Sequence, residues 1–147
     1  MAIKTFTGGI HPPERKAATT GKVIERIASP QQVVIPVNQH FGAPNKALVQ
    51  VGDTVKRGQK IADGAAPGPM TVPVHASIAG VVKKIEPRTQ SNNVDGLCIV
   101  IEANGSNETD FMSPLDPFSC TKEEALNRIR EAGLVGMGGA GFRSMLN

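Results

Sequence analysis

Short β-branched runs separated by glycine and proline restrict the fold of this chain more than any other feature. Six runs lie between residues 33 and 102: VVIPV (33–37), ALVQV (47–51), KIAD (60–63), TVPV (71–74), GVVKKI (80–85) and LCIVIE (97–102). Closely spaced short strands bounded by turn residues are typical of a small sandwich or barrel. Because Pro36 and Pro73 have no amide hydrogen for a ladder, we expect both at sheet edges or bulges.

An internal repeat connects two of these runs. Val34-Ile35-Pro36-Val37 recurs 37 positions later as Thr71-Val72-Pro73-Val74. Two related halves predict interlocked four-strand units with approximate twofold symmetry. The alternative is a chance match of β-branched residues around a proline. His40 and His75 follow the two Val-Pro-Val segments, so the repeat places them at one shared end of the barrel.

Composition narrows the class of protein. The chain has 147 residues, 16 basic and 13 acidic side chains, five Phe and no Trp or Tyr. This length fits about one domain with an aliphatic core, and the absence of a long apolar run predicts no transmembrane segment. So few aromatic side chains argue against nucleic-acid binding. Two cysteines form no disulfide framework, and the compartment is predicted to be cytoplasmic.

The segment VGDTVKRGQ (51–59) has two glycine turns around an expected outward strand, Val55 to Arg57, and ASIAGV follows at 76–81. This pair of motifs resembles the biotinyl/lipoyl-type barrel-sandwich hybrid, whose exposed hairpin carries a modified lysine. Aligned on the second motif, the acceptor position falls on Pro69, which has no amine. A carrier function would then need Lys60, which lies in an expected strand.

A helix is predicted near the C-terminus, after a proline-bearing stretch at 106–120. Thr121 and Glu124 have capping-box spacing, and Gly133 is a natural stop. Arg128 and Arg130 suit the negative end of the helix dipole. An apolar stripe at helical spacing is expected to face the core: Ala125, Leu126, Ile129 and Ala132.

The helix is followed by GMGGAGF at 136–142. Glycines at this density let the backbone approach a ligand closely, and consecutive free amides can cradle phosphate oxygens. A flexible tail is the alternative interpretation of the same residues.

Five motifs in order make a resemblance to one family specific: GGIHPPE (8–14), VIPVNQHFGAP (34–44), VGDTVKRGQ, VHASIAGVV (74–82) and GMGGAGF. Together they resemble the RnfC family of the Rnf electron transport complex. The resemblance implies a peripheral subunit on the cytoplasmic face of the membrane, in a complex that couples ferredoxin and NAD(H) redox chemistry to ion transport.

The same resemblance implies a cofactor site. The family's glycine-rich loop is similar to the flavin-binding loop of the NADH-oxidising subunit of respiratory complex I. Carried over, the residues at the start of a flavin or dinucleotide site are Gly136, Gly138, Gly139, Gly141 and Phe142. The full-length family holds FMN, NADH and 4Fe–4S clusters, whereas two isolated cysteines cannot hold a four-cysteine cluster.

The chain departs from the family pattern after Phe142, where Arg143 and Ser144 replace the usual proline and threonine. We therefore expect an N-terminal portion of a longer protein, without catalytic residues or cofactors of its own. The predicted organisation is an arm (1–32), a barrel-sandwich hybrid (33–105), a linker (106–120) and a helix that begins an incomplete flavin/NADH-binding domain (121–147). The expected function is scaffolding and docking among the subunits of the complex. A related soluble flavin and iron–sulfur reductase component is the alternative, and a biotin/lipoyl-type carrier is a weaker one.

Other chemistry-bearing residues lack a pattern. No short ligand spacing joins His11, His40, His75, Cys98 and Cys120, so no metal site is predicted. Cys120 precedes a capped helix, where the dipole favours a thiolate, but the sequence places no histidine beside it.

Overall fold

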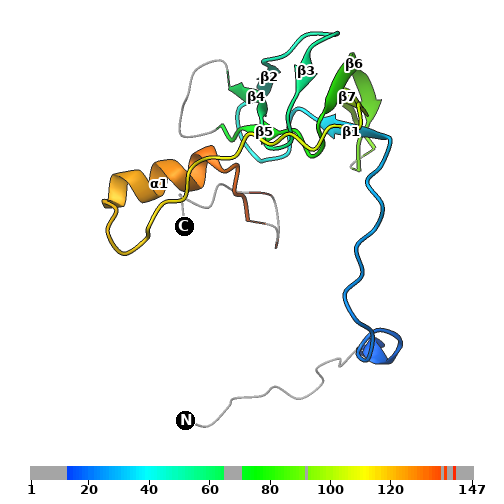
Figure 1. Cartoon of the computed structure of the whole chain (residues 1–147), viewed down its shortest axis with the longest axis vertical. Helices are drawn as coiled ribbons and strands as arrows, with labels where there is room; N and C mark the ends of the chain where they lie inside the picture. Colours follow the sequence, from blue (N-terminus) through cyan, green and yellow to red (C-terminus); the bar gives the residue numbers. More distant parts are fainter. Residues whose placement is uncertain (1–12, 65–70, 92, 137, 139–140, 142–147) are drawn as a thin grey trace.

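The computed structural model describes residues 13–64, 71–91, 93–136, 138 and 141. Its strands form two antiparallel sheets around one core (Figure 1). The four-stranded sheet has the order β1-β7-β6-β3 and the three-stranded sheet the order β2-β4-β5. The strands are β1 Gln32–Pro36, β2 Asn45–Ala47, β3 Thr54–Val55, β4 Lys60–Gly64, β5 Val74–His75, β6 Gly80–Thr89 and β7 Asp95–Ala103. The predicted mainly-β barrel-sandwich fold is confirmed.

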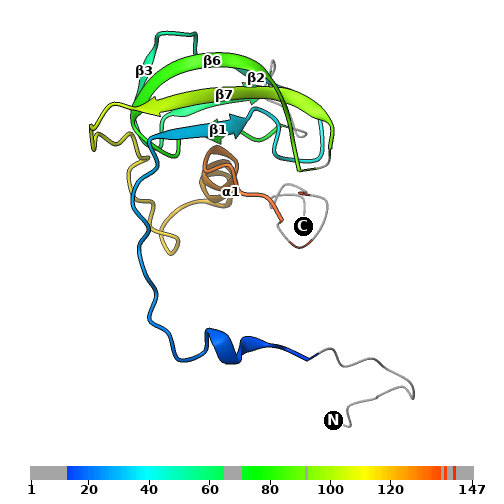
Figure 2. The same cartoon turned by 90° about the vertical axis from the view of Figure 1, so that its right-hand side faces the viewer.

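The long hairpin of β6 and β7 forms the curved back of the barrel (Figure 2). Its register runs from Gly80 opposite Ala103 to Thr89 opposite Asp95, with an irregularity between Val82 and Lys84. Bulges of this kind bend a strand and increase its twist. The bend lets the sheet curl over the core.

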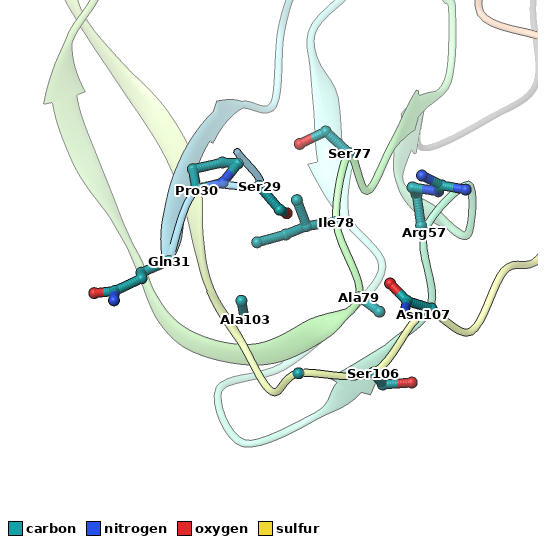
Figure 3. Close-up of a pocket in the computed structure, with 11 residues that line it drawn as sticks. Ser29, Pro30, Gln31, Arg57, Ser77, Ile78, Ala79, Ala103, Ser106 and Asn107 are labelled. Atoms are coloured by element: carbon teal, nitrogen blue, oxygen red, sulfur yellow. The ribbon is translucent and has the colours of Figure 1, made fainter. Parts of the chain in front are cut away.

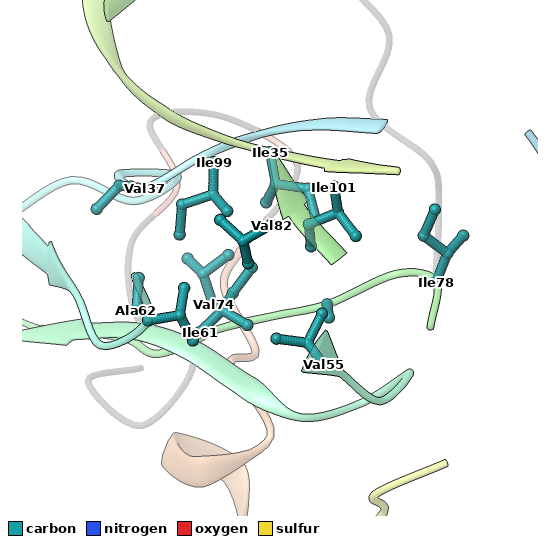
Figure 4. Close-up of a cluster of buried hydrophobic side chains, with 12 residues drawn as sticks. Ile35, Val37, Val55, Ile61, Ala62, Val74, Ile78, Val82, Ile99 and Ile101 are labelled. Atoms are coloured by element: carbon teal, nitrogen blue, oxygen red, sulfur yellow. The ribbon is translucent and has the colours of Figure 1, made fainter. Parts of the chain in front are cut away.

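The core is aliphatic, as the composition predicts (Figure 4). Ile99 and Ile101 of β7 and Val82 of β6 are fully buried and face Ile61 of β4. Val37 and Val74, the last residues of the two repeated segments, are buried in the same cluster. Alternate side chains of β1 point outward, so Val34 is exposed while Ile35 is buried.

Both repeat prolines lie at sheet edges, as predicted. Pro36 ends the edge strand β1, and Pro73 immediately precedes the edge strand β5. Pro87 lies within β6, opposite Leu97. Because β3 pairs only with Gly80 and Val81, β6 has a single neighbouring strand at Pro87, which removes the need for a second hydrogen bond.

Some strand predictions were wrong in detail. The run at 47–51 is mostly a turn, because the Asp53 carboxylate accepts a hydrogen bond from the Gln50 amide (2.8 Å) and closes it. The strand that follows is Thr54–Val55, with Val55 buried instead of facing outward. The described sheets contain four and three strands, so the two halves are not equal four-strand units.

The predicted helix is α1, Lys122–Glu131, and both of its ends follow the sequence signals. Thr121 and Glu124 form a complete capping box. Gly133 has φ 72°. At this end the Gly133 amide donates to Arg130 and the Leu134 amide to Ile129, the two hydrogen bonds of a Schellman motif. The apolar stripe is only half-buried, and the most buried side chain of α1 is Arg130.

Two segments flank the barrel. Residues 13–31 extend away from it and contain one 3-10 turn, Lys16–Ala18 (Figure 1, Figure 2). The start of the predicted linker runs along the barrel, because the Arg57 amide donates to Glu108 and the Asp110 amide donates to Arg57. The guanidinium of Arg57 also lies 5.6 Å from the centre of the Phe111 ring.

Candidate functional site

One end of the barrel brings the two repeated segments together. A cavity of about 220 Å³ lies there, lined by Gln39, His40, Val72, Pro73, Val74, His75, Gly133 and Val135. His40 and His75 line the same cavity, so the shared location predicted from the repeat is confirmed. The helix end at Gly133 forms part of the wall.

A buried amide joins the two repeated segments at this end. The Nδ2 of Asn45 donates to the carbonyl of Val37 at 3.0 Å and to that of Val72 at 2.7 Å. Asn45 is itself buried in β2. Its position in the sequence, shortly after Pro44, carried no signal for this role.

The glycine-rich segment returns to the same end of the barrel. The amide of Phe41 donates to the carbonyl of Gly141 at 3.1 Å, and Gly141 has φ 70°. A Cβ added to Gly141 would lie 3.5 Å from the Cα of His40. The segment therefore contacts the loop that follows the first Val-Pro-Val repeat.

The predicted cofactor residues are described only in part. Gly136 and Gly141 are half-buried and Gly138 is exposed, whereas Gly139 and Phe142 lie outside the described residues. A Cβ added to Gly138 would meet nothing within 4 Å, so a ligand could approach the backbone there. The cavity beside this segment is smaller than the ~300–1,000 Å³ of typical ligand pockets. The described residues thus fit one edge of a flavin site and do not enclose a flavin.

A polar cluster lies where α1 meets β4 and β5. The Nη2 of Arg130 donates to Asp63 Oδ1 at 2.9 Å and to Thr71 Oγ1 at 3.3 Å. The Nζ of Lys60 donates to Asp63 Oδ2 at 3.3 Å and pairs with Glu131, which also pairs with Arg130. We name these five residues the helix clamp. Arg130, Asp63 and Thr71 are 9%, 7% and 4% exposed, so the clamp is largely removed from water.

The clamp shifts the pKa values of its acids. Burial raises the pKa of Asp63, but hydrogen bonds from the Gly64 amide and Arg130, with the positive charges nearby, outweigh burial and hold it below its ordinary value. The pKa of Glu131 is lowered in the same way, since Lys60 and Arg130 outweigh its burial. Burial and the charge of Lys60 lower the pKa of His75, against the opposing charges of Glu131 and Asp63. At neutral pH the carboxylates are charged and His75 is neutral.

A second cavity of about 310 Å³ lies at the base of the arm (Figure 3). Its walls include Pro30 and Gln31 of the arm, Ile78 and Ala103 of the barrel, and Arg57. Figure 4 places Ile78 and Val37 at opposite ends of the core cluster. The two cavities are therefore separate features.

Other predicted sites can be compared with the structure where it describes them. Lys60 lies in β4 and its ammonium is engaged by two carboxylates, which does not suit a carrier lysine. Pro69 and His11 lie outside the described residues. Elsewhere in the described chain, no three His, Cys, Asp or Glu side chains gather in a way that could hold a metal ion. Within the same residues, no helix has the length and apolar character needed to cross a bilayer.

The two small sheets, the paired Val-Pro-Val segments and the terminal helix define the chain as a barrel-sandwich hybrid domain. The family model described as "RnfC Barrel sandwich hybrid domain" matches residues 4–106, and the chain belongs to this family.

Three curated relatives are named as the C-type subunit of an ion-translocating oxidoreductase complex. The relative from Serratia proteamaculans (strain 568) is 36% identical over 143 residues, which cover 95% of this chain and 20% of the relative. The relative from Klebsiella pneumoniae (strain 342) is 39% identical over 142 residues, or 93% of this chain and 18% of the relative. The relative from Pasteurella multocida (strain Pm70) is 38% identical over 140 residues, or 93% and 16%. The chain spans about a fifth or less of the length of these relatives.

Proposed function

We propose that this chain is a scaffold and docking domain of an ion-translocating oxidoreductase complex, and that it presents the start of a flavin-binding loop at one end of its barrel. The observation that carries the proposal is the contact of Gly141 with Phe41. This contact places a glycine-rich segment of the cofactor-binding type against a rigid β-scaffold. Binding constellations are more precise when rigid elements support them.

In this proposal, residues of the glycine-rich segment hold one side of the cofactor. Gly138 gives the backbone room to approach, Gly136 and Gly141 set the path of the segment, and Gly139 and Phe142 complete the set predicted from the sequence. A flavin there would supply transfer of electrons between NADH and iron–sulfur clusters. The chain's own part is to position the loop, and the chemistry belongs to the longer relatives.

The wider setting is also part of the proposal. The names of the relatives describe one subunit of an ion-translocating oxidoreductase complex. We extend this to electron exchange between ferredoxin and NAD(H), with the chain on the cytoplasmic face among other subunits. A soluble flavin and iron–sulfur reductase component remains the competing assignment.

The first experiment is a flavin titration followed by fluorescence quenching. It compares this 147-residue chain with the full-length relative from Klebsiella pneumoniae (strain 342). We expect saturable binding by the relative and none by the chain. Tight binding by the chain alone would overturn the scaffold assignment.

The docking function needs a separate experiment. Tagged chain is mixed with membranes that contain the other members of the complex, and with matched membranes that lack them. We expect retention only by the first preparation. Equal retention by both, or co-purification with a soluble reductase instead, would favour the competing assignment.

A further inference from the structure

Arg130 is an unusual residue to find at the most buried position of a surface helix. Arginine is rarely buried unless it is paired, because removing its charge from water is costly. An apolar side chain at position 130 would bury the same face of α1 without that cost. Buried polar pairs of this kind are best attested as devices that select one arrangement over others of similar stability.

The geometry of the helix clamp is directional. Arg130 reaches Asp63 at the end of β4 and Thr71 just before β5, so it holds both ends of the connection between these strands. Glu131, the next residue of the helix, pairs with Lys60 at the start of β4. Consecutive helical residues point about 100° apart. Two attachments on adjacent residues therefore oppose both rotation and sliding of α1.

The clamp is close to the glycine-rich segment. The helix ends at Gly133, where a Cβ would lie 2.7 Å from the carbonyl of Pro73, so the chain passes tightly over the second Val-Pro-Val repeat. From there it reaches Gly141, which accepts the hydrogen bond of Phe41. A small rotation of α1 would move the start of this path away from the barrel end.

We propose that Arg130 is a positioning residue, whose buried pair with Asp63 sets the rotation of α1 and thereby directs the glycine-rich segment onto the loop at residues 39–41. The functional meaning of this positioning rests on the proposed function. The positioning itself concerns only residues of this chain and can be tested without any cofactor.

The test uses the Phe41 amide as a reporter of the segment and the Val82 amide as a reporter of the barrel. Val82 donates to Asp53 at 2.8 Å, far from the clamp in sequence. Hydrogen exchange of both amides is followed by NMR on the 147-residue chain. The variants are Arg130→Met and the double variant Asp63→Leu/Arg130→Met, with Arg88→Met as control. Arg88 is an exposed arginine of β6 that pairs with Glu86.

In Arg130→Met we expect the Phe41 amide to exchange at least about tenfold faster, because an unpaired Asp63 remains buried and α1 loosens. The double variant removes this buried charge, and replacing both members of a buried pair by apolar residues is often neutral for stability. Its urea midpoint and Val82 exchange should therefore match wild type while Phe41 remains fast. The control should change neither amide.

The double variant decides the question. A Phe41 amide that exchanges as slowly as in wild type would overturn the proposal, because α1 would then be placed without the pair. Equal acceleration of Phe41 and Val82 would also overturn it, since the pair would then contribute only to global stability. The flavin titration of the longer relative can succeed or fail independently of either result.

Discussion

Replacing Asn45 by alanine tests whether the two repeated segments depend on one shared amide. The substitution leaves the carbonyls of Val37 and Val72 without their donor, at about 1–3 kcal/mol for each buried acceptor. The Oδ1 of Asn45 is buried without a hydrogen-bond partner among the described residues, so its removal returns about 1–3 kcal/mol. The net loss in the free energy of unfolding is about 2–3 kcal/mol at the centre of these ranges.

Urea unfolding followed by circular dichroism measures this loss. With a slope of about 2 kcal/mol per molar, the midpoint should fall by about 1–1.5 M. Asn38→Ala is the matched control, because Asn38 is an exposed asparagine of the loop after the first repeat and should leave the midpoint unchanged. If both substitutions gave the same small shift, the amide would not be what connects the repeated segments.

Three further predictions concern the helix and its clamp. Gly133→Ala should cost at least about 1–2 kcal/mol for a left-handed backbone, beyond the clash with Pro73, and should appear as faster amide exchange in α1; unchanged exchange would contradict this. Thr121→Ala should destabilise α1 by about 1 kcal/mol and Thr121→Ser by much less, as measured by helical circular dichroism on urea titration; equal losses would rule out the cap. Stability should fall in two steps on acidification, measured as urea midpoints. Because the folded pKa of His75 is lowered, the unfolded chain takes up this proton first, and stability declines as the pH drops below the ordinary histidine range. The contributions of Asp63 and Glu131 are complete above the ordinary carboxyl range and are lost as the pH falls through their lowered values. His75→Gln should remove the first step alone, and a first step that persists would show that another group causes it.

The features predicted from the sequence are those with local causes. The capping box at Thr121 and the stop at Gly133 depend on neighbouring residues, so spacing alone located both helix ends. The edge positions of Pro36 and Pro73 follow from a missing donor. Strand boundaries were less accurate at 47–51, because a side-chain hydrogen bond from Asp53 decided where the chain turns.

The helix clamp could not be predicted, because its partners are distant in the chain. Asp63 and Arg130 are 67 residues apart, and no spacing rule connects a residue at a strand end with one on a later helix. Locally, Arg130 fits the helix dipole, which is a sufficient explanation of a basic residue in a last turn. The signal that was present is the half-apolar stripe of α1. A helix with so narrow an apolar face requires some other means of attachment.

The clamp and the Phe41–Gly141 hydrogen bond together bear on the two interpretations of the glycine-rich segment. A flexible tail needs no fixed point beyond the helix, whereas this segment is held at Gly133 by the helix end and at Gly141 by the barrel. Closing a loop of this length costs little entropy compared with what the clamp and core supply. Glycine is then required for its backbone geometry: Gly133 and Gly141 have φ of 72° and 70° and adjoin the backbone of the two repeated segments. A segment fixed at both ends over a rigid barrel is arranged in advance for a ligand that approaches from the open side at Gly138, which is why we favour a cofactor-loop origin over a tail.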